Sequence, residues 1–509
     1  MELLKTEKTM LVPDEMEAHI QEHEATGGER DRCRRLWDYY RAKNRTILDK
    51  KAPDPNNPDN RTPVPYGRKI VTTFEGYAYR PHYISYKASD PAHEAYVKQL
   101  QATFDLNREH IKTSRAGRNT GIWGYSYELL YIDSMANAMT AGWKYNAPPP
   151  ADAGFNAKAE VRFFSVDPWE IILLYDYASE PKKQIGLRYY RLSDDHYKVE
   201  QYTRETVTVW DRTRSKDGGQ KWNYTIASQA QNFFGDVPIV AYYMGDDRLG
   251  IIEPVLPLID DYDLLVSDSF NEFDRFAHAY LILKKMHLVP PELKKEPGAE
   301  SRWLQLLKRR RVFENVPDTG DIKFLTKDIP TAYVEYMAKL VKDEIHTQSH
   351  VPDFKELATG TLSGAAIKRL LFDFENVCSS AEADFDEGLL DRIKLINVIY
   401  AKAGRLVDDT QAVTITHKRN MPDDLKEYAD TALVMKNAGF SAWLIASIMP
   451  DSVIPDPDEE LARQKEERES SFADLDQFQP KEEDGEEDGE EGKPVPAKIG
   501  EKAKKEEEG

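Results

Sequence analysis

The sequence predicts an α+β protein that is mostly helical, and three observations predict this class. Short runs rich in β-branched and aromatic residues follow one another between residues 161 and 243, with polar turns between them. Apolar residues at helical spacing precede and follow these runs. Residues 365–403 contain no proline and a single glycine, which favours one long helix. A chain of 509 residues is long enough for two or three domains.

The first half of the chain is predicted to contain a helical arm with a connector, residues 1–68, and an α/β domain, residues 69–250. The connector is rich in proline and asparagine. Five strands are expected in the α/β domain, at residues 161–166, 171–177, 185–192, 196–203 and 206–212. Short polar turns join the last three, which predicts an antiparallel meander.

Residues 251–277 are predicted to form a helix with two unlike faces. Apolar residues recur near helical spacing as far as Phe273, which predicts a packed face. The other face carries the acids Asp260, Asp261, Asp263, Asp268 and Glu272. If several copies stood around a channel, this face would repel DNA phosphates and let DNA pass without sticking. A solvated helix face in a monomer explains the same acids.

The remainder divides into shorter segments. They are a small α/β insert at 278–328, a second helix at 329–350, a loop at 351–364, a long helix at 365–403, a strand with two helices at 404–450, and an acidic tail at 451–509. The loop contains Pro352 and two glycines, which interrupt helical structure. A kink is expected in the long helix at Gly388. The tail is low in complexity and is predicted to be disordered.

The densest basic run lies in the 278–328 insert. It consists of Lys308, Arg309, Arg310 and Arg311. Cations at the end of a helix complement the helix dipole, so a solvated helix end explains the run. A contact with a partner protein or with DNA phosphates explains it as well.

Charge and composition exclude several classes of protein. The net charge is −20, and residues 459–509 carry half of it, with 19 acids and 9 bases. This balance argues against a protein that grips nucleic acid over its whole surface, but not against one through which DNA slides. The sequence shows neither an apolar run of 18 residues nor a signal peptide, which predicts a cytoplasmic chain without a membrane span. Cys33 and Cys378 are expected to be reduced thiols.

The familiar catalytic templates are absent from the sequence. It contains no phosphate-binding GxxxxGK[ST] loop, no GxSxG elbow and no HExxH zinc helix. His19 and His23 could share one helix face, as could His346 and His350. Neither pair has an evident third ligand, so these residues are interpreted as solvated histidines on helices.

A cluster of carboxylates offers the one remaining route to metal chemistry. Asp384, Asp386 and Glu387 could hold Mg²⁺ for a nuclease, because such sites need several carboxylates converging on the ion. Neighbours at i and i+2 on a helix point to different sides, so a charged outer face is the favoured interpretation. No cofactor and no covalent chemistry are expected.

Several stretches carry a likeness to a known family. They are NRTPVPYGRKIVTTFEGYAYRP (60–81), TGIWGYSYELLYID (120–133), the strands IGLRYYRL and VEQYT, VPIVAYYMGDDRLGIIEPVLPLIDDYDLLVSDSFNEFDRF (237–276), and PDPDEELARQKEE (455–467). In these stretches and in the order of its parts, the sequence resembles the portal proteins of long-tailed phages, in the family typified by siphophages of Gram-positive hosts. The likeness covers nearly all of residues 30–470.

The resemblance implies a portal fold, a ring of twelve subunits at one capsid vertex, and a name for each part. The parts would be an α/β wing (69–250), two stem helices (251–277 and 329–350), a clip (278–328), a tunnel loop (351–364), a long wing helix (365–403) and a crown (404–450). The tunnel-loop residues expected to face DNA are Val351, Pro352, Asp353, Phe354, Lys355, Glu356, Thr359, Gly360 and Thr361. The acids of 251–277 would line the channel, and the basic run would contact a partner or DNA.

The function implied by the resemblance is a conduit for double-stranded DNA during packaging and ejection, without enzymatic activity. The implied partners are further copies of the chain, the terminase large subunit, a head-completion or adaptor protein, and the major capsid and scaffolding proteins. The protein would reside in the virion, and in the host cytoplasm during assembly. Two alternatives stay open: a metal-dependent DNA-processing enzyme that uses the acids at 384–387, and a scaffold whose acidic tail binds a basic partner.

Overall fold

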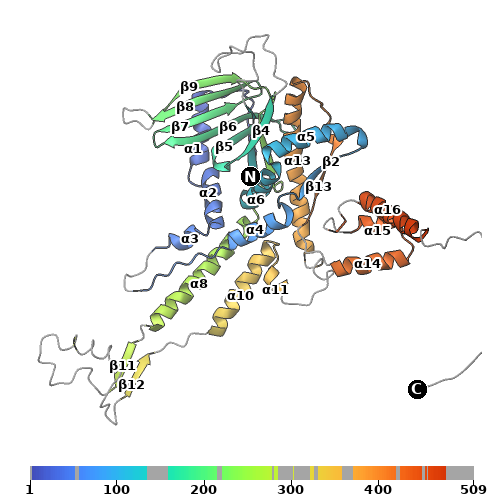
Figure 1. The fold of residues 1–509 in the computed structure, drawn as a ribbon. Helices are drawn as coiled ribbons and strands as arrows, with labels where there is room; N and C mark the ends of the chain where they lie inside the picture. The colour runs from blue at the N-terminus through green and yellow to red at the C-terminus, as the bar shows by residue number, and fades with distance from the viewer. Residues whose placement is uncertain are drawn as a thin grey trace, which may run out of the picture. The chain divides into compact units, whose positions relative to one another are not determined.

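The computed structural model describes the chain in two compact units, Met1–Met421 and Pro422–Gly509. Within them it describes residues 3–51, 57–133, 159–214, 221–277, 280–284, 302, 321–325, 331–357, 369, 371–419, 425–449, 453–454 and 457–476. Helices and strands are both abundant and occur in separate layers, which confirms the α+β class (Figure 1).

A six-stranded sheet forms one layer of the first unit. Its order is β1 (Leu4–Lys5), β5 (Ile171–Tyr175), β6 (Lys183–Ser193), β7 (His196–Tyr202), β8 (Thr206–Arg214) and β9 (Trp222–Gln231). Strands β5 to β9 pair antiparallel in sequence order, which confirms the predicted meander. The two-residue strand β1 adds to the opposite edge, parallel to β5.

The N-terminal helices are part of this unit and not a separate arm. Helix α1 (Pro13–Glu24) packs Met16 and Ile20 against apolar side chains of β5, β6 and β7. Its Glu17 accepts two hydrogen bonds from the buried guanidinium of Arg212 on β8, at 2.8 and 2.9 Å. Helix α2 (Glu29–Tyr40) and the single turn α3 (Arg45–Leu48) follow. The apolar stripe predicted for the arm is therefore buried within the unit.

A three-stranded sheet lies at the centre of the main core. Its order is β10 (Ile239–Tyr243), β3 (Tyr125–Asp133) and β4 (Glu160–Val166), all antiparallel. Around it pack α2, α4 (Tyr66–Ala78), α5 (Glu94–Asn107), α6 (Glu109–Trp123) and α13 (Phe372–Lys402). A small pair, β2 (Ile84–Ala88) with β13 (Val413–His417), closes one side. We call this assembly of sheets and helices the body.

Helix α13 runs through Gly388 without interruption. The glycine lies where the helix approaches β10 most closely, because a Cβ at this position would be 2.5 Å from Cδ1 of Tyr242 and 2.9 Å from the carbonyl oxygen of Ala241. The structure thus gives Gly388 a packing role. The predicted helix began at residue 365, and residues 365–368 and 370 lie outside the described part.

Two helices extend from the body and form what we call the helix pair. They are α8 (Leu256–Ala277) and α10 (Thr331–Gln348), and they contact each other (Figure 1). Between them in the chain, β11 (Tyr280–Lys284) and β12 (Asp321–Leu325) pair antiparallel. The turn α11 (Phe354–Leu357) follows α10. Short 3-10 helices lie at Pro91–His93, Pro168–Glu170, Glu253–Val255 and Thr410–Ala412.

The second unit contains three described helices, and one of them corrects a prediction. Helices α14 (Leu425–Asn437) and α15 (Ala442–Ser447) were expected, but α16 (Pro457–Asp476) lies in the tail predicted to be disordered. Proline at its first position and acids in its first turn favour a helix start, and no glycine or further proline interrupts it. The low-complexity interpretation was therefore wrong for residues 457–476. Within the described residues, no helix combines the length and the apolar character needed to span a membrane.

Candidate functional site: the helix pair and the segment that follows it

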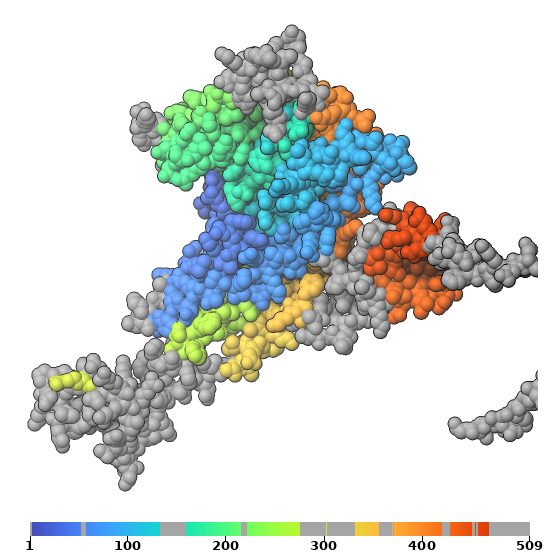
Figure 2. Space-filling model, in the orientation of Figure 1, coloured from blue at the N-terminus to red at the C-terminus, as the bar shows by residue number. Residues whose placement is uncertain are grey.

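One side of α8 carries a ladder of polar contacts with the connector. Backbone N–H groups of Asn60, Thr62 and Val64 donate to side chains of α8, at 2.7, 3.0 and 2.7 Å. The acceptors are Asn271, Ser267 and Asp263, in that order. Two residues of extended chain advance by about 6.6 Å and four residues of helix by about 6.0 Å, so the two spacings match. The connector therefore lies antiparallel along α8. In Figure 2, the yellow-green atoms of α8 lie against the blue N-terminal part of the chain.

The ladder corrects the prediction for Asp263. Its side chain is fully buried and also accepts from the side-chain amide of Asn44, so it cannot belong to an exposed acidic face. Burial raises the pKa of Asp263 to about 6, although the two donors Asn44 and Val64 oppose the shift. The sequence pattern missed this because the covering residues come from a segment about 200 positions earlier.

The other four predicted acids of α8 differ in exposure. Asp260 is half-buried and accepts from the hydroxyls of Tyr39 and Thr46, at 2.5 and 2.8 Å. Glu272 is also half-buried. Asp261 is exposed, and so is Asp268, which lies 3.6 Å from the ammonium of Lys50. Only Asp261 and Asp268 of the five predicted acids thus present a carboxylate freely to solvent.

The apolar stripe of α8 is only partly packed. It is buried at Leu256 and Ile259, close to the body, and becomes exposed at Phe270 and Phe273. Phe273 retains 67% of its accessible surface. Helix α10 likewise exposes apolar residues at i, i+3 and i+7, namely Tyr333, Tyr336 and Leu340. Large side chains left exposed in such a group on two neighbouring helices mark an interaction surface more often than an ordinary solvated face.

The chain after α10 is held at its base by a charged cluster. The carboxylate of Asp353 is almost fully buried and lies 3.0 Å from the ammonium of Lys69 on α4 and 2.7 Å from that of Lys342 on α10. Burial alone would raise the pKa of Asp353, but the two ammonium groups hold it well below its ordinary value. His346 adds a hydrogen bond of 2.8 Å between its Nδ1 and the carbonyl oxygen of Val351. This cluster fixes where the segment leaves α10.

These contacts decide the position of the first predicted loop residues. Val351 and the side chain of Asp353 are buried within the subunit, so the prediction that they face DNA was wrong. Pro352 is half-buried, whereas Phe354 and Lys355 are exposed. Glu356 lies in α11. Thr359, Gly360 and Thr361 lie outside the described residues, as do Lys308, Arg309, Arg310 and Arg311 of the insert.

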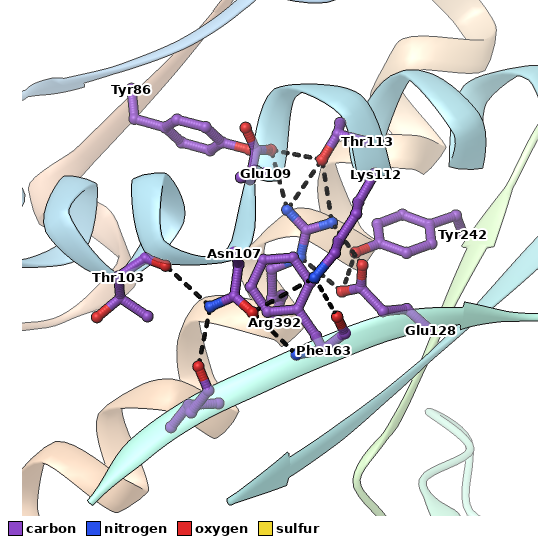
Figure 3. A network of polar contacts seen from close by, with 11 residues as sticks. Tyr86, Thr103, Asn107, Glu109, Lys112, Thr113, Glu128, Phe163, Tyr242 and Arg392 are labelled. Carbon is purple, nitrogen blue, oxygen red and sulfur yellow. Dashed lines mark hydrogen bonds and ion pairs between the residues drawn. The ribbon is translucent and has the colours of Figure 1, made fainter. Parts of the chain in front are cut away.

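A buried ionic network anchors α13 in the body (Figure 3). Arg392 is fully buried; its Nε lies 2.7 Å from one oxygen of Glu128 on β3, and another of its nitrogens lies 3.1 Å from the second oxygen. It also donates to Glu109 and Thr113 of α6, at 3.0 and 3.1 Å. Burial opposes its charge, but the carboxylates hold the pKa of Arg392 well above its ordinary value. Because two acids face one cation, further donors are needed.

Tyrosine hydroxyls supply those donors. Tyr86 donates to Glu109 at 2.6 Å and Tyr242 to Glu128 at 3.1 Å. Sequence reasoning missed this network, although a signal exists. Arg392 interrupts an apolar stripe with the spacing of one helix face, which consists of Phe385, Leu389, Ile396 and Ile399. An arginine in such a stripe predicts a buried partner of opposite charge.

The residues considered for metal chemistry are not brought together. Asp386 accepts from Nε2 of His417 at 2.8 Å, and no group of three or more potential ligands occurs among the described residues. The interpretation of the paired histidines as solvated was wrong for His23 and His346, which are both buried. The hydroxyl of Tyr189 lies 2.8 Å from Nδ1 of His23. Burial and the nearby Arg30 lower the pKa of His23 to about 4.

Comparison with known proteins gives two matches. A family model described as "Phage portal protein, SPP1 Gp6-like" matches residues 18–471. The portal protein of Bacillus phage SPP1 is 23% identical over 319 residues, which are 58% of this chain. The chain thereby spans 60% of the length of that relative. Since the family model covers far more than half of the sequence, the chain belongs to the family of phage portal proteins of the SPP1 Gp6-like type.

Proposed function

We propose that this protein forms a ring at one vertex of a phage capsid and that double-stranded DNA passes through the ring during packaging and ejection. The observation that carries the proposal is the family match over residues 18–471. A ring of about twelve copies would dock the terminase large subunit during packaging and a head-completion protein afterwards, within a shell of capsid and scaffolding proteins. The protein contributes a channel and a docking surface and performs no covalent step.

The helix pair is the part of the subunit that suits a contact between copies. Phe270, Phe273, Tyr333 and Tyr336 are exposed in the single subunit. Burying the two phenylalanines leaves no polar group unpaired, whereas the two tyrosine hydroxyls would need hydrogen-bond partners in the contact. Packing α8 of one copy against α10 of the next would remove this apolar surface from water. Such a contact joins two different surfaces of neighbouring copies. It closes into a ring when the rotation from one copy to the next is a whole fraction of a full turn.

We assign the channel wall to side chains of the helix pair and the following segment that are exposed in the single subunit. Asp261 and Asp268 remain available to repel phosphates, and Phe354 and Lys355 are the described residues of the following segment that can reach into a channel. The ionic cluster at Asp353 would hold the base of this segment still while its tip contacts DNA. The assignments for Lys308 to Arg311 and for residues 359–361 remain proposals of the same kind.

The mass of the purified protein tests the ring directly. Light scattering combined with negative-stain electron microscopy of the same peak should show a ring of about a dozen subunits with a central hole. A protein that stays monomeric at high concentration, and also when it is produced together with its capsid and scaffolding proteins, would refute the ring. A packaging extract without this protein should leave capsids empty, and adding it back should restore the DNA.

A further inference from the structure

The first unit contains a pocket rich in arginine, lined by residues of α2, β6, β7 and the 3-10 turn at Pro168–Glu170. Its volume is about 340 Å³, which suits one or two side chains of a ligand. Four guanidinium groups line it, from Arg30 and Arg34 on α2 and from Arg188 and Arg191 on β6. Trp169 and tyrosine rings form the remaining wall.

The cations of this pocket are only partly neutralised. Arg30 pairs with Glu24, Arg191 pairs with the exposed Asp194, and Arg188 lies 3.2 Å from Glu200. Even so, the Nε atoms of Arg30 and Arg188 are buried and have no hydrogen-bond acceptor among the described residues. A buried guanidinium N–H without an acceptor is costly, so these two atoms show that the hydrogen-bonding capacity of the pocket's arginines is not fully used within the subunit.

Arg34 is an exposed arginine of the pocket and has no carboxylate partner among the described residues. It lies one helical turn after Arg30 on the same face of α2. Like charges at i and i+4 destabilise a helix. Burial and the charge of Arg30 lower the pKa of Arg34, as expected for a cation without a counter-ion. The carboxylate in the pocket wall, Glu170, lies 3.6 Å from Arg188.

We propose that this pocket binds the carboxylates of an acidic peptide, such as residues 482–491 of a second copy of the chain. That segment consists of eight acids and two glycines, so its carboxylates can enter a small pocket without an aromatic or branched neighbour. Guanidinium groups bind carboxylates through paired, charge-assisted hydrogen bonds. A pocket of this volume does not admit a DNA duplex, which favours a peptide over the nucleic acid that the channel would carry.

The test is a titration of the full chain with a labelled synthetic peptide, KEEDGEEDGEEGK, which has the sequence of residues 481–493. Binding is followed by fluorescence anisotropy. A second full-length protein, in which the eight acids of 482–491 are replaced by glutamine and asparagine, removes competition from the chain's own segment. We expect binding that weakens as salt is added, and no binding of a peptide whose acids are replaced by amides.

Two substitutions on one helix separate the pocket from general charge. Arg34→Gln should weaken peptide binding about tenfold or more, the loss expected for a charge-assisted hydrogen bond. Arg35→Gln removes the same charge from the neighbouring, exposed position outside the pocket and should leave the affinity within about twofold. Arg34 is exposed at its tip, so thermal melting should show both variants folded.

Three outcomes would overturn the proposal. One is that the wild-type protein does not bind the peptide, or that Arg34→Gln binds the peptide as tightly as the wild type does. Another is that inorganic phosphate raises the melting temperature of the wild type but not of Arg34→Gln, while the peptide does not bind. This result would make the pocket a site for a free oxyanion. The third is binding of a labelled single-stranded oligonucleotide in place of the peptide. The titration needs a folded subunit and no ring, so its failure would leave the proposed channel function untouched.

Discussion

The body and the helix pair differ in which of their polar and apolar groups are buried within one subunit. In the body, the long helix α13 buries an arginine among apolar residues, and every charge in that network meets a partner from the same subunit (Figure 3). In the helix pair, α8 buries Asp263 against the connector and leaves Phe270 and Phe273 in water.

This difference shows which part of the subunit satisfies its polar and apolar groups without a second copy. Removing charges from water is tolerated only when each is paired and hydrogen-bonded, and the body meets that condition internally. The helix pair meets it for its polar side but not for its apolar side, because no described segment covers Tyr333, Tyr336 or Phe273. We therefore expect substitutions in the body to change folding and substitutions on the exposed stripe to change assembly.

The largest effect on stability is expected from Arg392→Met. The substitution leaves Glu128 and Glu109 buried without their cation, which should lower the free energy of unfolding by about 3–5 kcal/mol. Urea unfolding followed by tryptophan fluorescence measures it. Lys394→Met, at an exposed position of the same helix, should change the value by less than about 0.5 kcal/mol. Equal effects of the two would mean that the network does not hold α13.

A pH-dependent effect of similar size is expected at Asp263. Its pKa of about 6 in the folded protein exceeds the unfolded value of about 4, so the folded state binds the proton more tightly. Protonation of Asp263 therefore stabilises the folded state by about 3 kcal/mol below pH 4, and this contribution is lost as the pH rises through 6. Asp263→Asn should remove this part of the pH dependence. The exposed Asp261→Asn is the control, and a pH profile shared by wild type and Asp263→Asn would contradict the assignment.

A matched pair of glycines tests how tightly α13 lies on β10. Gly388→Ala places a methyl group against Tyr242 and the Ala241 carbonyl and should cost about 1–3 kcal/mol. Gly76→Ala, in α4, meets no atom within 4 Å and should instead stabilise by about 0.4–1 kcal/mol. Thermal melting of both variants gives the comparison. Stabilisation by Gly388→Ala would show that the helix can move away from the sheet.

The smallest effect on folding, and the sharpest test of the comparison, comes from the exposed stripe. The double substitution Phe270→Ser and Phe273→Ser should leave the stability of the subunit within about 0.5 kcal/mol, because both side chains are already in water. The same variant should no longer form rings by light scattering. Leu192→Ser, at an exposed position of β6, should assemble normally. Rings formed by the double variant would move the subunit contact away from the helix pair.

Much of the fold could be predicted from the sequence because local patterns report local structure. Runs rich in β-branched and aromatic residues predicted β4 to β8, apolar residues near helical spacing predicted α8, and a stretch without proline predicted most of α13. Strand β9 was missed although Trp222, Tyr224 and Ile226 alternate with polar residues at its start, because its second half, ASQAQ, contains no large apolar residue. The helix α16 was missed because acidic composition was given more weight than its helix-start signals.

The sequence by itself determined most of the segments that form helices and strands, the family resemblance that the model match later confirmed, and the acidic character of the tail. Only the tertiary structure decided which polar groups are buried, as at Asp263, Arg392, His23 and Asp353. The physical reason is that periodicity shows the faces of a helix but not what covers them. Each of these groups has a partner that lies between 166 and 284 positions away in the chain.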